Sequence, residues 1–114
     1  MNFQVETNDD VTILVLSGRF DAYSVSEIRS WISDHKDVSK VVVNLASVNF
    51  VDSTALSTLV QGMKWTRQRG GDLHLASLQQ PVHIIFELTR LDKAFKIFSD
   101  LDEAVQAFSV AQPA

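Results

Sequence analysis

The stretch VVVNLASVNFVDSTAL, residues 41–56, decides the fold of this chain. Residues 40–45 are apolar almost without interruption and rich in β-branched side chains, which predicts a central strand with both faces covered. Asp52-Ser53-Thr54 then precedes apolar residues at helical spacing, a pattern that indicates the start of a helix. The stretch therefore predicts a buried strand followed by a helix.

The residues before this stretch predict a hairpin and a first helix. Apolar and polar side chains alternate over residues 3–7, and a nearly continuous apolar run follows at 11–16, with a turn signal between the two. We expect residues 17–22 to break the second strand. Ser24 stands three residues before Glu27, which is the spacing of a capping box, and a helical repeat of apolar residues follows.

The residues after the stretch continue the alternation of helices and strands. They predict a helix stop at Gly70-Gly71, a strand at 72–76, a helix opened by Pro81, a short edge strand at 94–98, and a closing helix at 101–108. This order favours an α/β fold with a mixed, mostly parallel sheet of about five strands packed against about four helices.

Length and composition exclude several classes of protein. The chain has 114 residues, which suits a single domain, expected over residues 1–110 with a frayed tail at 111–114. It has no cysteine, which excludes disulfides and thiolate sites. The net charge of −4 argues against non-specific nucleic-acid binding. No apolar run approaches the roughly 20 residues of a membrane span, and no signal peptide is evident, so we expect a cytoplasmic protein.

The sequence gives little support for a catalytic site or a metal site. His35, His74 and His83 fall on separate predicted elements without metal-ligand spacing, so we expect three unrelated surface or half-buried histidines. The four glycines form no phosphate-binding motif. We therefore expect no catalytic residue, no metal, no cofactor and no enzymatic activity.

The motif Asp52-Ser53-Thr54 has two interpretations. In the simpler one, Asp52 or Ser53 caps the helix by accepting hydrogen bonds from free backbone N–H groups. In the other, Ser53 is a regulated hydroxyl. Phosphorylation would add about −1.5 to −2 charges at a helix N-terminus, which the helix tolerates but an acidic or apolar partner surface does not.

The sequence resembles STAS domains, specifically bacterial anti-sigma-factor antagonists. Residues 41–56 match the family signature, and the resemblance covers nearly the whole chain. Further matches are the loop Ser17-Gly18-Arg19-Phe20-Asp21, the turn Gly70-Gly71-Asp72-Leu73, and the helices at 81–91 and 101–108. This resemblance implies the STAS fold, which agrees with the predicted order of strands and helices.

The resemblance also implies a function. In such antagonists the anti-sigma factor, a serine-protein kinase of the histidine-kinase-like ATPase type, phosphorylates the serine after the motif aspartate. That serine is Ser53 here, with Thr54 as the second candidate. The unphosphorylated antagonist binds the anti-sigma factor and frees the sigma factor, and a PP2C-type phosphatase restores it. The resemblance places eight residues on or beside the surface that binds the partner: Gly18, Arg19, Phe20, Asp21, Asp52, Ser53, Thr54 and Leu56. We expect the protein to be a monomer, because a small antagonist must present this surface freely.

Two departures and two alternatives accompany this interpretation. Ala55 and Arg90 stand where the family commonly has glycine, and arginine would be strained if its φ were positive. The first alternative is a STAS accessory subunit of a lipid transporter or of a larger signalling assembly, without a phospho-switch, where Ser53 and Thr54 only cap the helix. The second is a small hydrolase using Ser53, which lacks a histidine placed to activate the hydroxyl.

Overall fold

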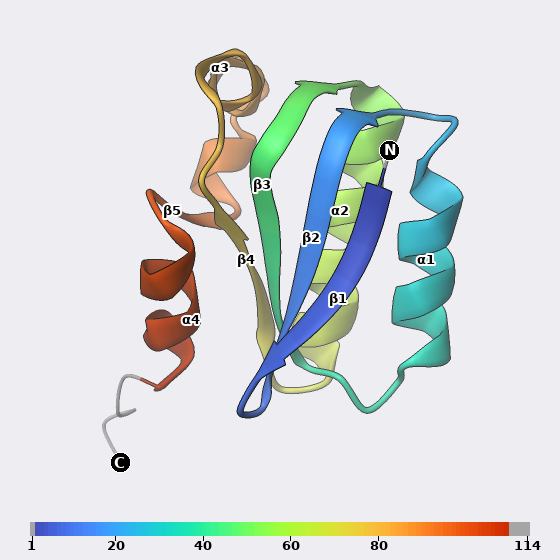
Figure 1. The fold of residues 1–114 in the computed structure, drawn as a ribbon, viewed down its shortest axis with the longest axis vertical. Helices are drawn as coiled ribbons and strands as arrows, with labels where there is room; N and C mark the ends of the chain where they lie inside the picture. Colours follow the sequence, from blue (N-terminus) through green and yellow to red (C-terminus); the bar gives the residue numbers. More distant parts are fainter. Residues whose placement is uncertain (1, 110–114) are drawn as a thin grey trace.

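Five strands form one sheet whose spatial order follows the chain, β1-β2-β3-β4-β5 (Figure 1). The structure is a computed structural model that describes residues 2–109, so the predicted domain end at residue 110 and the tail at 111–114 lie outside the described residues. The elements are β1 (Asn2–Asn8), β2 (Val11–Phe20), α1 (Val25–Asp34), β3 (Lys40–Val51), α2 (Ser53–Gln68), β4 (Asp72–Ala76), α3 (Gln80–Leu88), the 3-10 turn η1 (Leu91–Lys93), β5 (Lys96–Phe98) and α4 (Leu101–Ser109).

The sheet is mixed and mostly parallel, as predicted. β1 and β2 form the expected antiparallel hairpin, in which Phe3 lies opposite Leu16. β2, β3, β4 and β5 run parallel to one another. The short edge strand predicted at 94–98 is β5, which covers Lys96–Phe98 and pairs with β4. The α/β fold class is therefore confirmed.

Helices cover both faces of the sheet. Leu14 and Val43 point into the larger hydrophobic cluster, which also contains the buried hydrophobic residues of α1, α2 and α3. Ile13 and Val42 point to the opposite face, where α4 packs with Ala104. α2 lies behind the strands in the view of Figure 1. The two-sided burial explains why the central strands are apolar at successive positions rather than alternating.

β2 and β3 are longer than predicted. β2 does not break at residue 17 but continues to Phe20, and β3 continues to Val51. The pairing between these strands continues through two register shifts, at Val15/Ser17 and at Gly18/Arg19. Gly18 supports the second shift with a φ of 92°, a conformation that glycine adopts without strain. As a result, both strands extend to the first turn of α2.

The predicted capping box at the start of α1 is wrong. The Ser24 side chain makes no capping hydrogen bond to the helix. Its hydroxyl instead accepts a hydrogen bond from the backbone N–H of Asp21 at 2.9 Å and donates one to the Arg19 carbonyl at 3.2 Å. Ser24 therefore stabilises the loop between β2 and α1, which belongs to the site described below.

No helix within residues 2–109 is long and apolar enough to cross a membrane.

The predicted stop at Gly70-Gly71 is confirmed, because α2 ends at Gln68 and Gly70 has a φ of 87°. Gly71 lies against the connection before β3. A Cβ atom at position 71 would stand 1.8 Å from the Ser39 carbonyl oxygen, a backbone atom. The same close approach lets the next N–H, that of Asp72, donate to the Ser39 carbonyl at 2.9 Å.

We expect Gly71→Ala to lower the free energy of unfolding by about 2–3 kcal/mol, because the added methyl group forces backbone apart. Gly62→Ala, inside α2, is the matched control. Its Cβ would meet the flexible ends of Ile32 and Leu73 at 3.1 Å, and alanine gains about 1 kcal/mol in helix propensity. Urea unfolding of both variants measures the difference. Equal stability of the two variants would contradict the close approach at Gly71.

Candidate functional site

The carboxyl ends of β2 and β3 meet the N-terminus of α2 at one edge of the sheet, at the top of Figure 1. Phe20 pairs with Val51, and the Asp52 N–H points to the Phe20 carbonyl at 3.4 Å. The residues that this edge leaves accessible are here called the apical surface: Gly18, Arg19, Asp21, Ala22, Tyr23, Phe50, Asp52, Ser53 and Thr54. It contains every sequence-predicted site residue except two.

The Asp52 carboxylate joins two elements of the apical surface. Its Oδ1 accepts a hydrogen bond from the N–H of Ala55 at 2.8 Å, which caps α2. Its Oδ2 accepts a hydrogen bond from the N–H of Ala22 at 3.0 Å, which holds the loop between β2 and α1. Because these N–H groups, Ala55 foremost, favour the charged form, they lower the pKa of Asp52.

Ser53 is the first residue of α2, and its side chain is exposed. Of the two residues that were candidates for the cap, Asp52 is the cap and Ser53 is not. None of the side-chain hydrogen bonds within residues 2–109 uses the Ser53 hydroxyl. Thr54 is half-buried beside it. The helix therefore does not need the Ser53 hydroxyl, which stays open to solvent.

Asp21 orders the loop next to Asp52. Its Oδ1 accepts a hydrogen bond from the N–H of Tyr23 at 3.0 Å, and its backbone carbonyl accepts one from the N–H of Ser24 at 2.9 Å. Arg19 approaches the other carboxylate oxygen with its Nε at 3.6 Å. The two acidic side chains of the apical surface are thus both bonded to backbone N–H groups of this loop.

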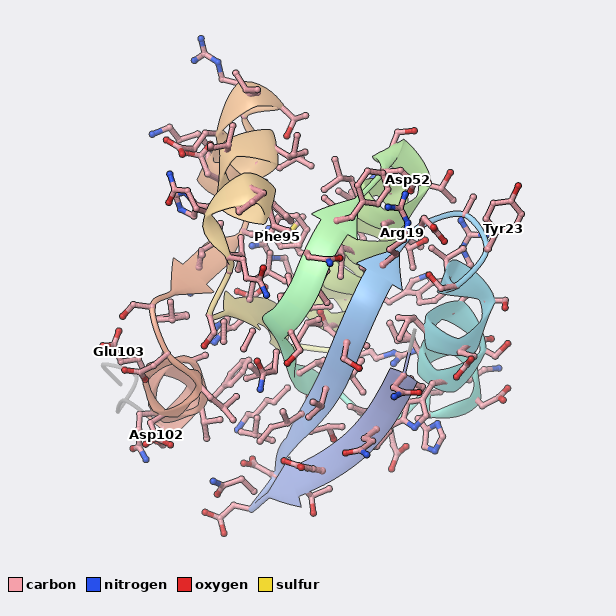
Figure 2. All side chains as sticks on the ribbon, turned by 45° about the horizontal axis from the view of Figure 1, so that its top comes forward. Arg19, Tyr23, Asp52, Phe95, Asp102 and Glu103 are labelled. Atoms are coloured by element: carbon pink, nitrogen blue, oxygen red, sulfur yellow. The ribbon has the colours of Figure 1, made fainter. Side chains whose placement is uncertain are left out.

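Two exposed aromatic residues complete the apical surface, and the sequence reasoning missed both. Tyr23 is 96% exposed, and Figure 2 shows it on the loop beside Arg19 and Asp52. Phe50 lies under the Arg19 guanidinium, whose Cζ is 3.9 Å from the ring centroid. A lone tyrosine in a polar loop is a sequence signal for an exposed aromatic residue, so Tyr23 could have been predicted. No local pattern predicts the exposure of Phe50, because its orientation depends on its register with Arg19.

Phe20 and Leu56, predicted as partner-binding residues, are buried rather than accessible. Phe20 is 0% exposed and Leu56 is 8% exposed, and both belong to the larger core cluster. Their side chains pack in the core because burial removes apolar surface from water. They lie beneath the apical surface and support it.

The family model of the STAS domain matches residues 2–104. The chain belongs to the STAS domain family. An anti-sigma F factor antagonist of Paenibacillus polymyxa is 26% identical to this STAS domain over 114 residues, which cover 96% of this chain and 95% of the relative.

Two solved structures have the same fold. An anti-sigma factor antagonist from Mycobacterium paratuberculosis is 25% identical, with a TM-score of 0.83 over 95% of this STAS domain and 93% of that chain. The phosphorylated form of the Bacillus cell fate determinant SpoIIAA is 21% identical, with a TM-score of 0.74 over 93% of this STAS domain and 98% of that chain. The likeness to SpoIIAA shows the shared fold.

The two departures from the family pattern have different consequences in this STAS domain. Ala55 is buried in the first turn of α2 and donates its N–H to Asp52, so alanine fits there. Arg90 has a φ of 64°, in the left-handed region that favours glycine. The strain foreseen for a positive φ is therefore present at Arg90, which follows the C-terminal cap of α3.

The histidines of this STAS domain lie outside the apical surface, so Ser53 has no histidine base there. The prediction of three surface or half-buried histidines is wrong for His74, which is fully buried beneath α4. Its Nδ1 lies 2.9 Å from the Ala104 carbonyl, and burial lowers its pKa.

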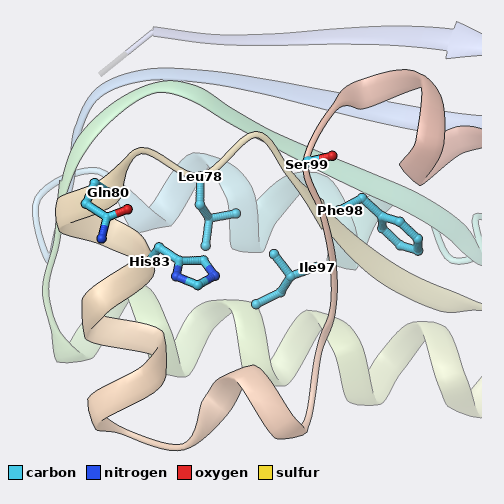
Figure 3. A pocket seen from close by; sticks show the side chains of 6 residues that line it. All are labelled: Leu78, Gln80, His83, Ile97, Phe98 and Ser99. Atoms are coloured by element: carbon cyan, nitrogen blue, oxygen red, sulfur yellow. The ribbon is translucent and has the colours of Figure 1, made fainter.

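His83 lines a hollow of about 400 Å³ between α3 and β5 (Figure 3) and pairs with Glu87 at 3.0 Å. Among the described residues, no group of three His, Cys, Asp or Glu could hold a metal ion.

We expect the stabilisation by Asp52 to depend on pH. Because its pKa is lowered in the folded state, its contribution is complete above the unfolded value of about 3.9 and is lost as the pH falls through the folded pKa. Asp52→Asn should therefore be less stable than the wild type at neutral pH, and this difference should shrink below about pH 4. Chemical unfolding at several pH values measures it.

Asp37→Asn is the matched control, since it removes the same charge from the exposed connection between α1 and β3. If the two variants showed the same pH profile, the backbone bonds of Asp52 would not be the cause.

Proposed function

We propose that this STAS domain is an anti-sigma-factor antagonist whose apical surface binds an anti-sigma factor and whose binding is switched by phosphorylation of Ser53. One observation carries the proposal: the Asp52 side chain caps α2, which leaves the Ser53 hydroxyl on the apical surface exposed and without a side-chain hydrogen bond among the described residues. The similarity to antagonists over nearly the whole chain supports it. The proposal places the chain in the cytoplasm as a monomer.

The switch uses a phosphoryl transfer in each direction. A partner kinase transfers the γ-phosphoryl group of ATP to the Ser53 oxygen, so that a new O–P bond forms, ADP leaves, and the hydroxyl proton passes to a base of the kinase. A PP2C-type phosphatase then hydrolyses the O–P bond with water and releases inorganic phosphate. ATP and its metal belong to the partner enzymes, and the STAS domain supplies the hydroxyl.

The geometry supports a switch that changes binding without unfolding the domain. A phosphate at the first residue of α2 adds about −1.5 to −2 charges where the helix dipole favours an anion. The carboxylates of Asp52 and Asp21 already lie at this surface. An acidic residue of the partner would then meet three negative groups, and such like-charge contacts cost several kcal/mol, or roughly 100-fold in affinity.

We expect Ser53→Asp to weaken binding of the cognate anti-sigma factor at least tenfold, because even one added negative charge opposes docking. Ser53→Ala should bind as tightly as the wild type and accept no phosphate from the kinase. Isothermal titration calorimetry with the purified anti-sigma factor measures the affinities. Ser30→Asp is the matched control, since Ser30 is exposed in the middle of α1. Wild-type affinity of Ser53→Asp would overturn the switch.

We expect Tyr23→Ala to weaken the same binding about tenfold, because exposed aromatic residues at an interface often carry much of its energy. Leu88→Ala is the control, since Leu88 is 75% exposed on α3 and lies outside the apical surface. Calorimetry should show unchanged affinity for Leu88→Ala, and thermal unfolding should show both variants folded. Equal affinities of the two variants would mean that the loop carrying Tyr23 is not at the interface.

A further inference from the structure

The backbone of β2 gives Arg19 a special placement. The register between β2 and β3 shifts between Gly18 and Arg19, and Gly18 has a φ of 92°. Such bulges re-aim the side chain that follows them and are frequent beside functional sites. Arg19 consequently pairs with Phe50 across the two strands and lays its guanidinium on the Phe50 ring.

The present contacts of Arg19 hold it only loosely. Its Nε is 3.6 Å from the Asp21 carboxylate, beyond the usual length of a charge-assisted hydrogen bond, and its side chain is 63% exposed. A guanidinium has five N–H donors, and none of them makes a hydrogen bond within residues 2–109. The carboxylate of Asp21 is already shared with the N–H of Tyr23. Arg19 is therefore a cation whose donors are largely free.

Arg19 is also the cation of the apical surface, which otherwise carries the acidic residues Asp21 and Asp52. Figure 2 shows Arg19 beside Asp52, the residue before Ser53. The strands confirm this proximity, because Phe20, which follows Arg19, pairs with Val51 and faces the Asp52 N–H with its carbonyl. A change of side-chain rotamer moves a guanidinium by several ångströms without a change in the backbone.

We propose that Arg19 is the intramolecular counter-ion of a phosphate on Ser53, and that pairing with this phosphate draws Arg19 off the Phe50 ring. The inference rests on the phosphorylation of Ser53 proposed above. A dianion with three acceptor oxygens is a stronger partner for a guanidinium than an aromatic face or a carboxylate that backbone groups already occupy. Phosphorylation then changes the shape of the apical surface as well as its charge.

The test needs no partner protein. Phosphoserine is incorporated at position 53 during translation, and its second ionisation is followed by ³¹P NMR titration. Because a nearby cation favours the dianion, Arg19→Gln should raise the pKa of the phosphoserine by about half a unit or more. Arg19→Lys, which keeps the charge, should restore part of the shift. In the wild type, the Arg19 side-chain protons should lose the ring-current shift from Phe50 on phosphorylation.

Phosphoserine at position 30, on α1, is the control, and its titration should not respond to Arg19→Gln. An unchanged titration of phosphoserine 53 in Arg19→Gln would overturn the proposal, as would Arg19 protons that keep their ring-current shift on phosphorylation. Neither result would contradict the proposed binding switch, because that switch is tested by the affinity of Ser53→Asp for the anti-sigma factor. Conversely, an unchanged affinity of Ser53→Asp would not contradict the Arg19–phosphate pair, which is tested by the phosphoserine titration.

Discussion

The Asp52 carboxylate is the interaction on which the apical surface depends. One oxygen caps α2 through Ala55, and the other holds the loop between β2 and α1 through Ala22. These two bonds connect segments that are 30 residues apart in the sequence. A carboxylate that satisfies free N–H groups at a helix start is favourable for the hydrogen bonds and for the helix dipole together. Because Asp52 performs both structural tasks, Ser53 is left without one.

The C-terminal end of α2 also bonds to neighbouring elements. The Arg69 guanidinium donates to the carbonyls of Val38 at 3.0 Å and His35 at 3.2 Å, in the connection between α1 and β3. Arg67 pairs with Asp72 at 2.9 Å, at the beginning of β4. The helix that carries Ser53 is thus tied at both ends to neighbouring elements. The exposed side chains beside this helix include those of Arg19 and Tyr23.

The apical surface carries the two carboxylates of Asp21 and Asp52 and the guanidinium of Arg19. Its two carboxylates are stabilised by backbone N–H groups, and its guanidinium rests on an aromatic ring. The guanidinium is the charged group whose donors make no hydrogen bond among the described residues. The proposed phosphate on Ser53 would make the net charge of this surface more negative, above a core that contains Phe20 and Leu56.

Much of the architecture is readable in the amino-acid sequence, because it depends on local patterns of polarity. The apolar run at 40–45 required a strand buried on both faces, Asp52-Ser53 marked a helix start, and Gly70-Gly71 marked its end. The sequence also carried enough of the family signature to indicate a STAS domain and to single out Ser53. These features are determined by neighbours in the chain, so the pattern alone was sufficient.

The remaining features arise only when strands and helices come together. The length of β2 and β3 depends on two register shifts between them, and the orientation of Phe50 toward Arg19 follows from that register. Ser24 and Glu27 have the spacing of a capping box, yet the Ser24 hydroxyl bonds to Asp21 and Arg19 in the loop and not to the helix. Local spacing determined where each element begins, and the packing of residues distant in sequence decided which side chains face a partner and which, like Phe20, Leu56 and His74, are buried.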